Sequence, residues 1–388
     1  MADIDDRWHR KGPNGKPVRT ARYGKGSRWI VRWRDPSGIQ RKKAFRLKAD
    51  AEDFAGTVRQ EVRTGSYIAP DAGKILVEEW ARRWAEAQGH LKESTHARSV
   101  GVVQNYVLPR WGRTPLSAVT FTEIQVWVTD LTRKGSAPRT VAKILGVFRQ
   151  ILGWAVRDGR LVRNPADGVP VPRPGELHTH RYLDHAAVAL MAQECGPYGP
   201  LIRLLAYTGL RWGEVAALRL RHVDLGSRRI HVVASVTEVN GRLVWGTPKT
   251  HQRRVVPVPR FLAAELVPLV EGRDAEALLF RAPRGGVLRV RNFRRNVLDP
   301  VVRRTGPAGF HPHELRHTAA SLAIASGADV KVVQMMLGHK TATMTLDLYG
   351  HLFPDRMDDL ADRLDSAACA PNVPQDDDGD DEQPETPR

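Results

Sequence analysis

The sequence predicts a multidomain protein of mixed α+β class, mainly helical, with a small sheet near its N-terminus and a small antiparallel sheet in its C-terminal half. Its 388 residues exceed the size of one ordinary domain. Most of the chain shows helical periodicity, whereas alternating or β-branched runs beside turn signals occur in two regions. Segments with Pro and Gly at residues 66–74 and 164–175 separate these blocks. We therefore expect domains at residues 1–65, 75–166 and 178–366, with a disordered acidic tail at 367–388.

The first domain is predicted from a period-two pattern. Residues 1–20 are polar and rich in Gly and Pro, so we expect a flexible leader there. In RWIVRWR, residues 28–34, tryptophan and valine alternate with arginine, as in a half-buried strand. Turn chemistry at 35–38 leads to a returning strand at 40–47, and a helix follows from about Ala51. We expect a small basic three-stranded sheet backed by one helix.

Helical patterns fill residues 75–166, and local signals mark where the helices begin. Ser94 is a candidate cap for the second helix. Thr120 and Glu123 form a capping-box pattern that opens the third helix. Pro138 suits the first turn of a fourth helix. The segment therefore predicts a domain of four or five helices.

Residues 178–366 open with helical periodicity, cross a β region and return to helices. Residues 228–236, RRIHVVASV, are largely β-branched, and Asn240-Gly241 is the strongest two-residue hairpin signal. RRVVPVP, residues 253–259, predicts a further strand. We expect an α-rich domain that contains a small antiparallel sheet.

Charge is the most informative property of the composition. The net charge is +17 and the pI is near 10.3, although residues 376–385 are strongly acidic. Such an excess of arginine and lysine favours nucleic acid as a partner. A solvated charged face gives the same local pattern, so each individual contact is a hypothesis. The candidate DNA-binding residues on the N-terminal sheet and the fourth helix are Arg28, Arg32, Arg34, Arg41, Lys42, Lys43, Arg139 and Lys143.

The composition argues against several other classes of protein. No stretch approaches the roughly 20 uncharged apolar residues of a membrane span, and the N-terminus lacks a signal-peptide pattern. Cys195 and Cys369 are too few for a disulfide framework or a zinc site. A G-x-x-x-x-G-K-[ST] nucleotide loop is also missing. We expect a cytoplasmic protein that needs no membrane, metal or cofactor.

The first segment suited to phosphate chemistry is TGLRWGE, residues 208–214. Gly209 is expected to end one helix and Arg211 to begin the next. The guanidinium would then lie at a helix N-terminus, where both its fork and the helix dipole favour an anion. Glu214, one turn further on, can hold Arg211 in place.

The second segment, HELRH, puts imidazole beside guanidinium. His313 and Arg316 are three residues apart, so one helical face presents both. The pair suits general acid–base work next to charge stabilisation. The same letters spell H-E-x-x-H, in which both histidines of a metalloprotease bind zinc; the basic charge favours DNA over that alternative.

The third segment is LGHKTATMTLDLYGH. Gly338 is expected to break a helix before His339. Thr341 or Thr343 can cap the next helix, along which Tyr349 lies. A lone tyrosine at such a position is ordinarily a packed core or interface residue, so its interpretation depends on the other two segments.

The joint pattern TGLRxGE, HxLRH and LGHxxxxxTxxxYxH, in this order within one domain, is similar to the tyrosine recombinase (phage integrase) family. Each piece alone is common, but the combination is specific. The resemblance covers the chain from about Arg181 to Leu364. The helical region before it resembles the family's core-binding domain, and the basic sheet resembles the arm-type DNA-binding domain of three-domain integrases.

The resemblance implies a catalytic set and a reaction. Tyr349 would attack a DNA phosphorus atom and form a 3′-phosphotyrosine, with His313 accepting its proton and Lys249 protonating the leaving 5′ oxygen. Two arginines and a histidine would stabilise the transition state, and Glu214 would support the first arginine. No metal or cofactor is implied. The matched catalytic residues are Arg211, Lys249, His313, Arg316, His339 and Tyr349.

The resemblance also implies partners. These are the double-stranded DNA of attachment sites, a homotetramer assembled on DNA, and an accessory excision or host DNA-bending factor. The implied function is integration and excision of a phage or other mobile element in the cytoplasm of a bacterial host.

Two other functions stay open from the sequence. A type IB topoisomerase shares the tyrosine chemistry, and relaxation of plasmid without cognate sites would reveal it. A non-catalytic DNA-binding regulator would form no covalent adduct through Tyr349.

Overall fold

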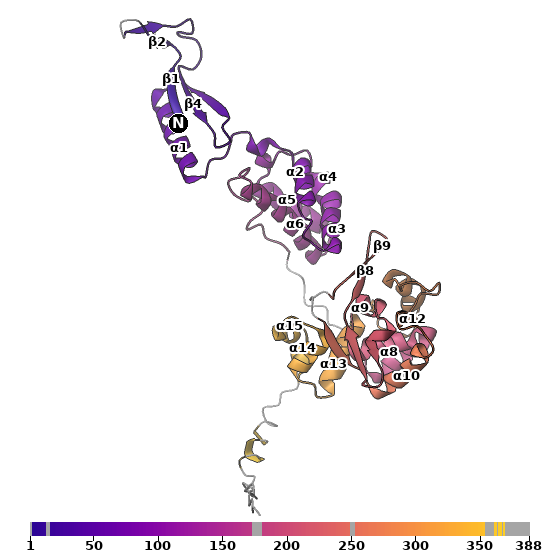
Figure 1. The fold of residues 1–388 in the computed structure, drawn as a ribbon. Coiled ribbons are helices and arrows are strands. Elements are labelled where there is room, and N and C mark those ends of the chain that lie inside the picture. Colours follow the sequence, from indigo (N-terminus) through magenta and orange to yellow (C-terminus); the bar gives the residue numbers. More distant parts are fainter. Residues whose placement is uncertain are drawn as a thin grey trace, which may run out of the picture. The chain divides into compact units, whose positions relative to one another are not determined.

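The computed structural model describes residues 2–12, 16–172, 181–248 and 253–353, together with short pieces at 361–362, 364–366 and 368. It is mainly helical and divides into two compact units (Figure 1). The first unit is built mainly from residues up to His178 and the second mainly from Thr179 onward. In the part of the chain that the structure describes, none of the helices combines the length and apolarity needed to cross a bilayer. The predicted mixed, mainly helical class is confirmed.

The N-terminal body is a three-stranded antiparallel sheet backed by one helix, as predicted. Strand order is β1-β4-β5, with β4 in the middle. Val31 and Trp33 of β4 are buried against Ala55 and Val58 of the helix, because alternate side chains of a strand share one face. The elements are β1 (Ala2–Asp6), β4 (Trp29–Arg34), β5 (Gln40–Phe45) and α1 (Lys48–Thr64).

The flexible leader predicted for residues 1–20 is wrong for the part that is described. β1 pairs with β4 along its whole length, and a second hairpin joins β2 (His9–Lys11) to β3 (Pro17–Arg19). The reason is that Ala2 and Ile4, alternate residues of β1, pack against the apolar core between the sheet and α1. The aspartates between and after them face basic residues, as in the 2.8 Å pair of Asp6 with Arg28, so the polar composition of the strand does not prevent pairing.

The second body contains a bundle of helices with one continuous apolar core, which includes Trp80, Trp111 and Phe148. The helices at Glu93–Val102 and Leu108–Trp111 are continuous through a π-helical turn at Val103–Val107. The elements are η1 (Ala72–Lys74), α2 (Val77–Glu86), α3 (Glu93–Val102), α4 (Leu108–Trp111), η3 (Leu116–Ala118), α5 (Phe121–Arg133) and α6 (Pro138–Arg157).

Two of the three helix starts predicted in this body follow the local signals. The side chain of Thr120 accepts the backbone N–H of Glu123 at the start of α5, and Pro138 is the first residue of α6. The cap predicted at Ser94 is wrong, because α3 begins at Glu93 after Lys92 and Ser94 already lies inside the helix.

The linker predicted at residues 164–175 packs in part against the helical body. Asn164 donates its side-chain amide to the carbonyl of Arg149 at 3.0 Å, and Ala166 and Val169 are buried in the core. The guanidinium of Arg149 donates twice to the carbonyl of Ala166. Residues 173–180 lie outside the described part.

The second unit surrounds the largest apolar core, in which α8 packs against α13. Figure 1 shows the C-terminal helices α13, α14 and α15 close together in this unit. Its helices are α7 (His185–Glu194), η4 (Gly196–Tyr198), α8 (Gly199–Thr208), α9 (Trp212–Ala216), η5 (Leu220–His222), α10 (Arg260–Val270), α11 (Val290–Phe293), η6 (Arg294–Leu298), α12 (Asp299–Thr305), α13 (Glu314–Ala325), α14 (Val330–Leu337), α15 (Ala342–Tyr349) and η7 (Gly350–Leu352).

Two small antiparallel sheets lie mainly in this unit. β8 (Ser235–Val239) and β9 (Arg242–Gly246) form the predicted hairpin, whose Asn240 and Gly241 have φ of 49° and 80°. The further strand predicted at residues 253–259 does not join that hairpin. It is β10 (Arg254–Pro257), which pairs with β7 (Arg229–Val232) in the order β10-β7-β6, where β6 is Val223–Asp224.

Candidate active site

The site begins at the tight junction between α8 and α9. Gly209 ends α8 with φ of 63°, and a Cβ added there would lie 2.5 Å from the side chain of Leu337. Only glycine therefore fits, for both its backbone conformation and its close approach to α14. Arg211 follows as the N-cap residue of α9 and donates to the Glu214 carboxylate at 3.0 Å. The Glu214 carboxylate in turn accepts the backbone N–H of Arg211, so the junction is held from both sides.

Glu214 is almost fully buried and holds two guanidinium groups at once. Arg254, which opens β10, forms a bidentate pair with it through contacts of 2.9 and 2.7 Å. Burial alone would raise the pKa of Glu214, but the hydrogen bonds and charges of Arg254 and Arg211 lower it below the ordinary value. The carboxylate therefore stays ionised and fixes both arginines.

Arg254 is a residue that sequence reasoning missed. Its signal was present, since Arg254 shares a strand face with Val256 and Val258, and both of these are buried. A cation on the apolar face of a strand needs a buried partner. Nothing in the sequence indicated that this partner would be Glu214.

Arg316 lies inside the unit on α13, with its side chain almost fully buried. It donates to the carbonyl of Gly209 at 2.5 Å and to the carbonyl of Leu337 at 2.6 Å. Burial and the neighbouring charge of Arg211 lower its pKa to about 9. The guanidinium is therefore still protonated at neutral pH and is held by main-chain atoms.

Three arginines converge on the C-terminal end of α14. The carbonyls of Met336, Leu337 and Gly338 accept hydrogen bonds from Arg254, Arg316 and Arg211 respectively. The last carbonyls of a helix lack intrahelical partners, and the helix dipole is negative at that end, so cations are favoured there. We call these three side chains the arginine cluster.

Gly338 permits this convergence. It has φ of 66°, and a Cβ added there would lie 3.0–3.2 Å from the side chain of Arg254. The predicted helix break at Gly338 is confirmed, and so is the cap at Thr341, whose side chain accepts from the backbone of Met344.

His339 follows at once and is buried beside the cluster. Its Nδ1 lies 3.0 Å from the hydroxyl of Thr345. Burial and the charges of Arg316 and Arg211 lower the pKa of His339 to about 4. The imidazole is therefore neutral at physiological pH.

Tyr349 is the last residue of α15 and is only 1% exposed. Its ring is parallel to that of His339, with centroids 6.3 Å apart. Its hydroxyl lies 2.8 Å from Nδ1 of His317, which is also buried. Burial raises the pKa of the phenol above its ordinary value, although the charge of Arg316 acts against that rise.

The two histidines of HELRH occupy different environments. His313 is exposed at the N-cap of α13, whereas His317, one turn further on, faces Tyr349. The two imidazole rings meet edge to face, with centroids 5.1 Å apart. Sequence reasoning considered His317 only as a zinc ligand, although its spacing of four residues from His313 was a usable signal for a shared helix face.

The structure thus brings together five of the six residues predicted as catalytic. Lys249 is the exception, because it lies outside the described residues. The described residues contain no group of three or more metal-ligating side chains placed to hold an ion.

The predicted DNA-binding residues all belong to the first unit, and several of them have acidic partners. Arg28 pairs with Asp6 and Arg32 with Asp5. Arg41 pairs with Asp35 and Asp71. The remaining ones are exposed: Arg34, Lys42 and Lys43 in the N-terminal body, and Arg139 and Lys143 on α6.

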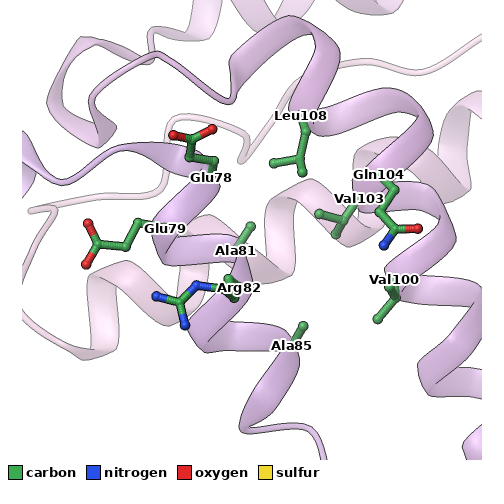
Figure 2. A pocket seen from close by; sticks show the side chains of 9 residues that line it. All are labelled: Glu78, Glu79, Ala81, Arg82, Ala85, Val100, Val103, Gln104 and Leu108. Atoms are coloured by element: carbon green, nitrogen blue, oxygen red, sulfur yellow. The ribbon is translucent and has the colours of Figure 1, made fainter.

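A groove of about 500 Å³ lies in the helical body, and unlike the arginine-rich site it is lined largely by apolar side chains. Figure 2 shows Ala81 and Ala85 of α2 facing Val103 and Leu108 across it. Carboxylates line part of its edge, and none of the residues predicted for catalysis or DNA binding lines it.

Comparison with known proteins covers both the helical body and the second unit. Residues 184–356 match the model of the phage integrase family, and residues 77–169 match the model of the phage integrase central domain. The N-terminal sheet lies outside both matches.

Several curated proteins are similar in sequence. Tyrosine recombinase XerC of Ralstonia pickettii is 30% identical over 268 residues, which span 65% of this chain and 81% of the relative. XerC of Mycobacterium tuberculosis is 32% identical over 260 residues, which span 62% of this chain and 82% of the relative.

Solved structures show the same fold at lower identity. The Tn1549 transposon integrase in complex with transposon right end DNA matches with a TM-score of 0.65 at 20% identity, covering 76% of this chain and 100% of that one. A lambda integrase tetramer bound to a Holliday junction matches with a TM-score of 0.55 at 17% identity, covering 81% and 94%.

Proposed function

The chain belongs to the phage integrase family of tyrosine recombinases, enzymes that break and rejoin DNA, and from this premise we propose that it integrates and excises a mobile element at specific sites. The observation that carries the proposal is the arginine cluster beside His339 and Tyr349. The basic N-terminal sheet, which precedes both matched regions, favours an integrase with a separate arm-binding domain over a protein of XerC type.

The arginine cluster supports a phosphate site. A guanidinium has five N–H donors. Arg316 uses one N–H of each terminal nitrogen, on the carbonyls of Gly209 and Leu337. Its remaining donors, with those of Arg211, would hold the non-bridging oxygens of the scissile phosphate. They would also stabilise the added charge of the pentacoordinate transition state.

His339 would complete this site as a neutral donor. If its Nδ1 accepts the hydroxyl proton of Thr345, the ring hydrogen is on Nε2 and points to the opposite edge of the ring. That N–H would donate to a phosphate oxygen without adding a further buried charge.

Tyr349 would be the nucleophile. Its oxygen attacks phosphorus as its proton passes to a histidine of the HELRH segment, the bond from phosphorus to the 5′ oxygen breaks, and a 3′-phosphotyrosine stores the bond energy. Lys249 would protonate the leaving 5′ oxygen, in keeping with its place in the family's motif. A 5′ hydroxyl from another strand then reverses the step and rejoins DNA.

Domains and partners follow from the same proposal. Residues 1–65 would bind arm sites, 75–166 would bind the core site together with the catalytic domain at 178–366, and the acidic tail would occupy 367–388. The partner would be the double-stranded DNA of attachment sites. The solved lambda integrase is a tetramer on a Holliday junction, and we infer a homotetramer on DNA here, with an accessory excision or host DNA-bending factor, in the cytoplasm of a bacterial host.

The test is covalent trapping. The attachment site is found by sequencing the junctions between the element and its host, and a nicked form of that site is incubated with protein. We expect a covalent adduct with the native chain and none with Tyr349→Phe, while affinity for the duplex stays nearly unchanged. Tyr207→Phe is the matched control, because the Tyr207 hydroxyl also bonds a histidine, His185, at 2.7 Å.

Three outcomes would contradict the proposal. Strand cleavage by the Tyr349→Phe variant would show that Tyr349 is not the nucleophile. Relaxation of plasmids that lack attachment sites would indicate a type IB topoisomerase instead. The absence of any adduct with the native chain on a verified site would indicate a DNA-binding regulator.

A further inference from the structure

His317 is a buried group that contacts the hydroxyl oxygen of Tyr349, whereas the catalytic set implied by the resemblance leaves it out and assigns the proton of Tyr349 to His313. Its Nδ1 lies 2.8 Å from the Tyr349 hydroxyl, and the two ring centroids are 5.6 Å apart. His317 is 6% exposed and Tyr349 is 1% exposed, so both are shielded from bulk water. The side chain follows Arg316 directly on α13, which fixes it next to the arginine cluster.

The direction of this hydrogen bond follows from the chemistry of the two groups. A buried phenol whose pKa is raised keeps its proton, so Tyr349 donates the bond. Nδ1 of His317 must then accept it, which requires a neutral imidazole with its hydrogen on Nε2. A base within hydrogen-bond reach of the proton to be removed satisfies the first condition for general base catalysis.

His313 differs from His317 in its exposure to solvent. It is exposed at the start of α13, and its ring meets the ring of His317 at 5.1 Å between centroids. His317 therefore lies in direct contact with the phenol, and His313 contacts His317. An exposed imidazole in contact with His317 is placed to exchange a proton between that residue and solvent or DNA.

We propose that His317 is the catalytic residue that accepts the proton of Tyr349 during DNA cleavage, and that His313 acts on that proton only afterwards. The proposal rests on the proposed function. In the step, the phenol oxygen forms a bond to phosphorus and its proton moves to Nδ1 of His317, giving an imidazolium. The phosphorus–5′-oxygen bond breaks, and the leaving oxygen takes a proton from the general acid. Rejoining runs the same transfers in reverse, so His317 returns the proton to the phenol.

The experiment separates proton acceptance from packing by using His317→Asn. An asparagine oxygen can occupy the place of Nδ1 and accept the phenol hydrogen bond, but it cannot take up the proton. We measure single-turnover adduct formation on the nicked attachment site, together with DNA affinity and melting temperature. We expect the cleavage rate to fall by roughly 10²- to 10⁴-fold, the usual contribution of a general base, with DNA affinity unchanged.

A more acidic nucleophile provides the decisive second measurement. Fluorotyrosine, introduced at position 349 by amber suppression, loses its proton more readily than tyrosine. We expect it to restore the His317→Asn rate by at least about tenfold while changing the native rate little, because only the variant then lacks an acceptor. A purely structural role for His317 would show no such rescue.

His313→Asn is the matched control, since it makes the same change one helical turn away. We expect a smaller loss and no rescue by fluorotyrosine. Rescue confined to His313→Asn would overturn the proposal and assign the acceptor to His313. A His317→Asn rate equal to or above the native rate would also overturn it, because the bond would then only restrain the phenol.

Two further points keep the result interpretable. If His317→Asn melts at a much lower temperature, the fluorotyrosine comparison is repeated in His317→Gln, and the same presence or absence of rescue decides. Failure of the proposed function would look different, because the native chain itself would then form no adduct.

Discussion

Two arginine-rich regions of this molecule use their charges in different ways. In the arginine cluster, Arg316 is buried and the side chain of Arg254 is only 9% exposed, and all three members are held by Glu214 or by the end of α14. In the N-terminal sheet, Arg28 and Arg32 face aspartates on the neighbouring strand, and the side chain of Arg32 is 52% exposed. The net charge of the chain therefore does not distinguish arginines that are fixed inside the site from arginines that face solvent.

The difference teaches that burial determines what an acidic partner does. A buried carboxylate fixes the position of an arginine, and removing it leaves an uncompensated charge in a medium of low dielectric. An exposed carboxylate is screened by water and salt, so it contributes little to stability and competes with other anions for the arginine. Removing the acidic partner should therefore have opposite consequences in the two regions.

The largest effect is expected for Glu214→Gln. The change leaves Arg254 buried without a counter-charge, and breaking such a pair typically costs about 3–5 kcal/mol. We expect that loss in urea unfolding, and loss of adduct formation at temperatures where the variant is still folded. Glu265→Gln is the control in the same unit, because its pair with Arg203 is partly exposed. A Glu214 variant as stable as this control would contradict the distinction between the two regions.

The next effect is a dependence of stability on pH through His339. Its pKa in the folded state, about 4, lies below the ordinary value, so the unfolded chain binds the proton more tightly. The stabilising contribution is therefore complete above about pH 6.5 and is lost as pH falls through the folded pKa, to a total of about 3 kcal/mol. Unfolding of native protein and His339→Gln at pH 7, 5.5 and 4.5 measures this difference. Equal pH profiles for the two proteins would show that the imidazole is not held neutral.

Gly338→Ala tests the fit of Arg254 against α14. Alanine must adopt a positive φ, which costs roughly 1–2 kcal/mol, and its Cβ crowds the guanidinium. Gly327→Ala isolates the backbone cost, because Gly327 has φ of 88° and no described atom within 4 Å of an added Cβ. We expect both variants to lose stability, but only Gly338→Ala to lose much of its cleavage rate. Equal cleavage by the two variants would mean that the cluster tolerates displacement.

The smallest effect on stability is expected for Asp5→Asn with Asp6→Asn. The change releases Arg28 and Arg32 from partly exposed pairs, so the melting temperature should hardly move. If the sheet binds DNA as proposed, affinity for arm-site duplex rises, and the slope of log affinity against log salt steepens by about one for each released arginine.

Asp3→Asn is the control for this double change. It removes a charge from the same strand, and Asp3 forms no ion pair with any residue that the structure describes. Identical salt slopes for native protein and the double variant would argue against Arg28 and Arg32 as phosphate contacts.

Features that depend on local chemistry could be predicted from the sequence. The cap at Thr120, the helix ends at Gly209 and Gly338, and the hairpin turn at Asn240 each depend on a few neighbouring residues. The resemblance to a known family then indicated which side chains to consider as a site.

Features that depend on distant partners could not be predicted. The strand at Ala2–Asp6 forms because β4 offers it a free edge and the core beneath the sheet accepts Ala2 and Ile4. The role of Arg254 depends on a carboxylate 40 residues away in the chain. The partner of the Tyr349 hydroxyl is set by how α13 and α15 pack, which no spacing within HELRH specifies. The role of Lys249 stays a prediction.

The anchoring of three arginines on the main chain of α14 has a consequence for how this site can change over generations. A carbonyl oxygen is present whatever residue carries it. Exposed side chains of α14 such as Val332 and Met335 can therefore vary without loosening the grip on Arg254 and Arg316, whereas Met336 and Leu337 are held by their own burial in the core. Variation can accumulate on this helix while the geometry for chemistry persists. That tolerance makes α14 a segment where a designer could alter neighbouring surfaces and leave the reaction intact.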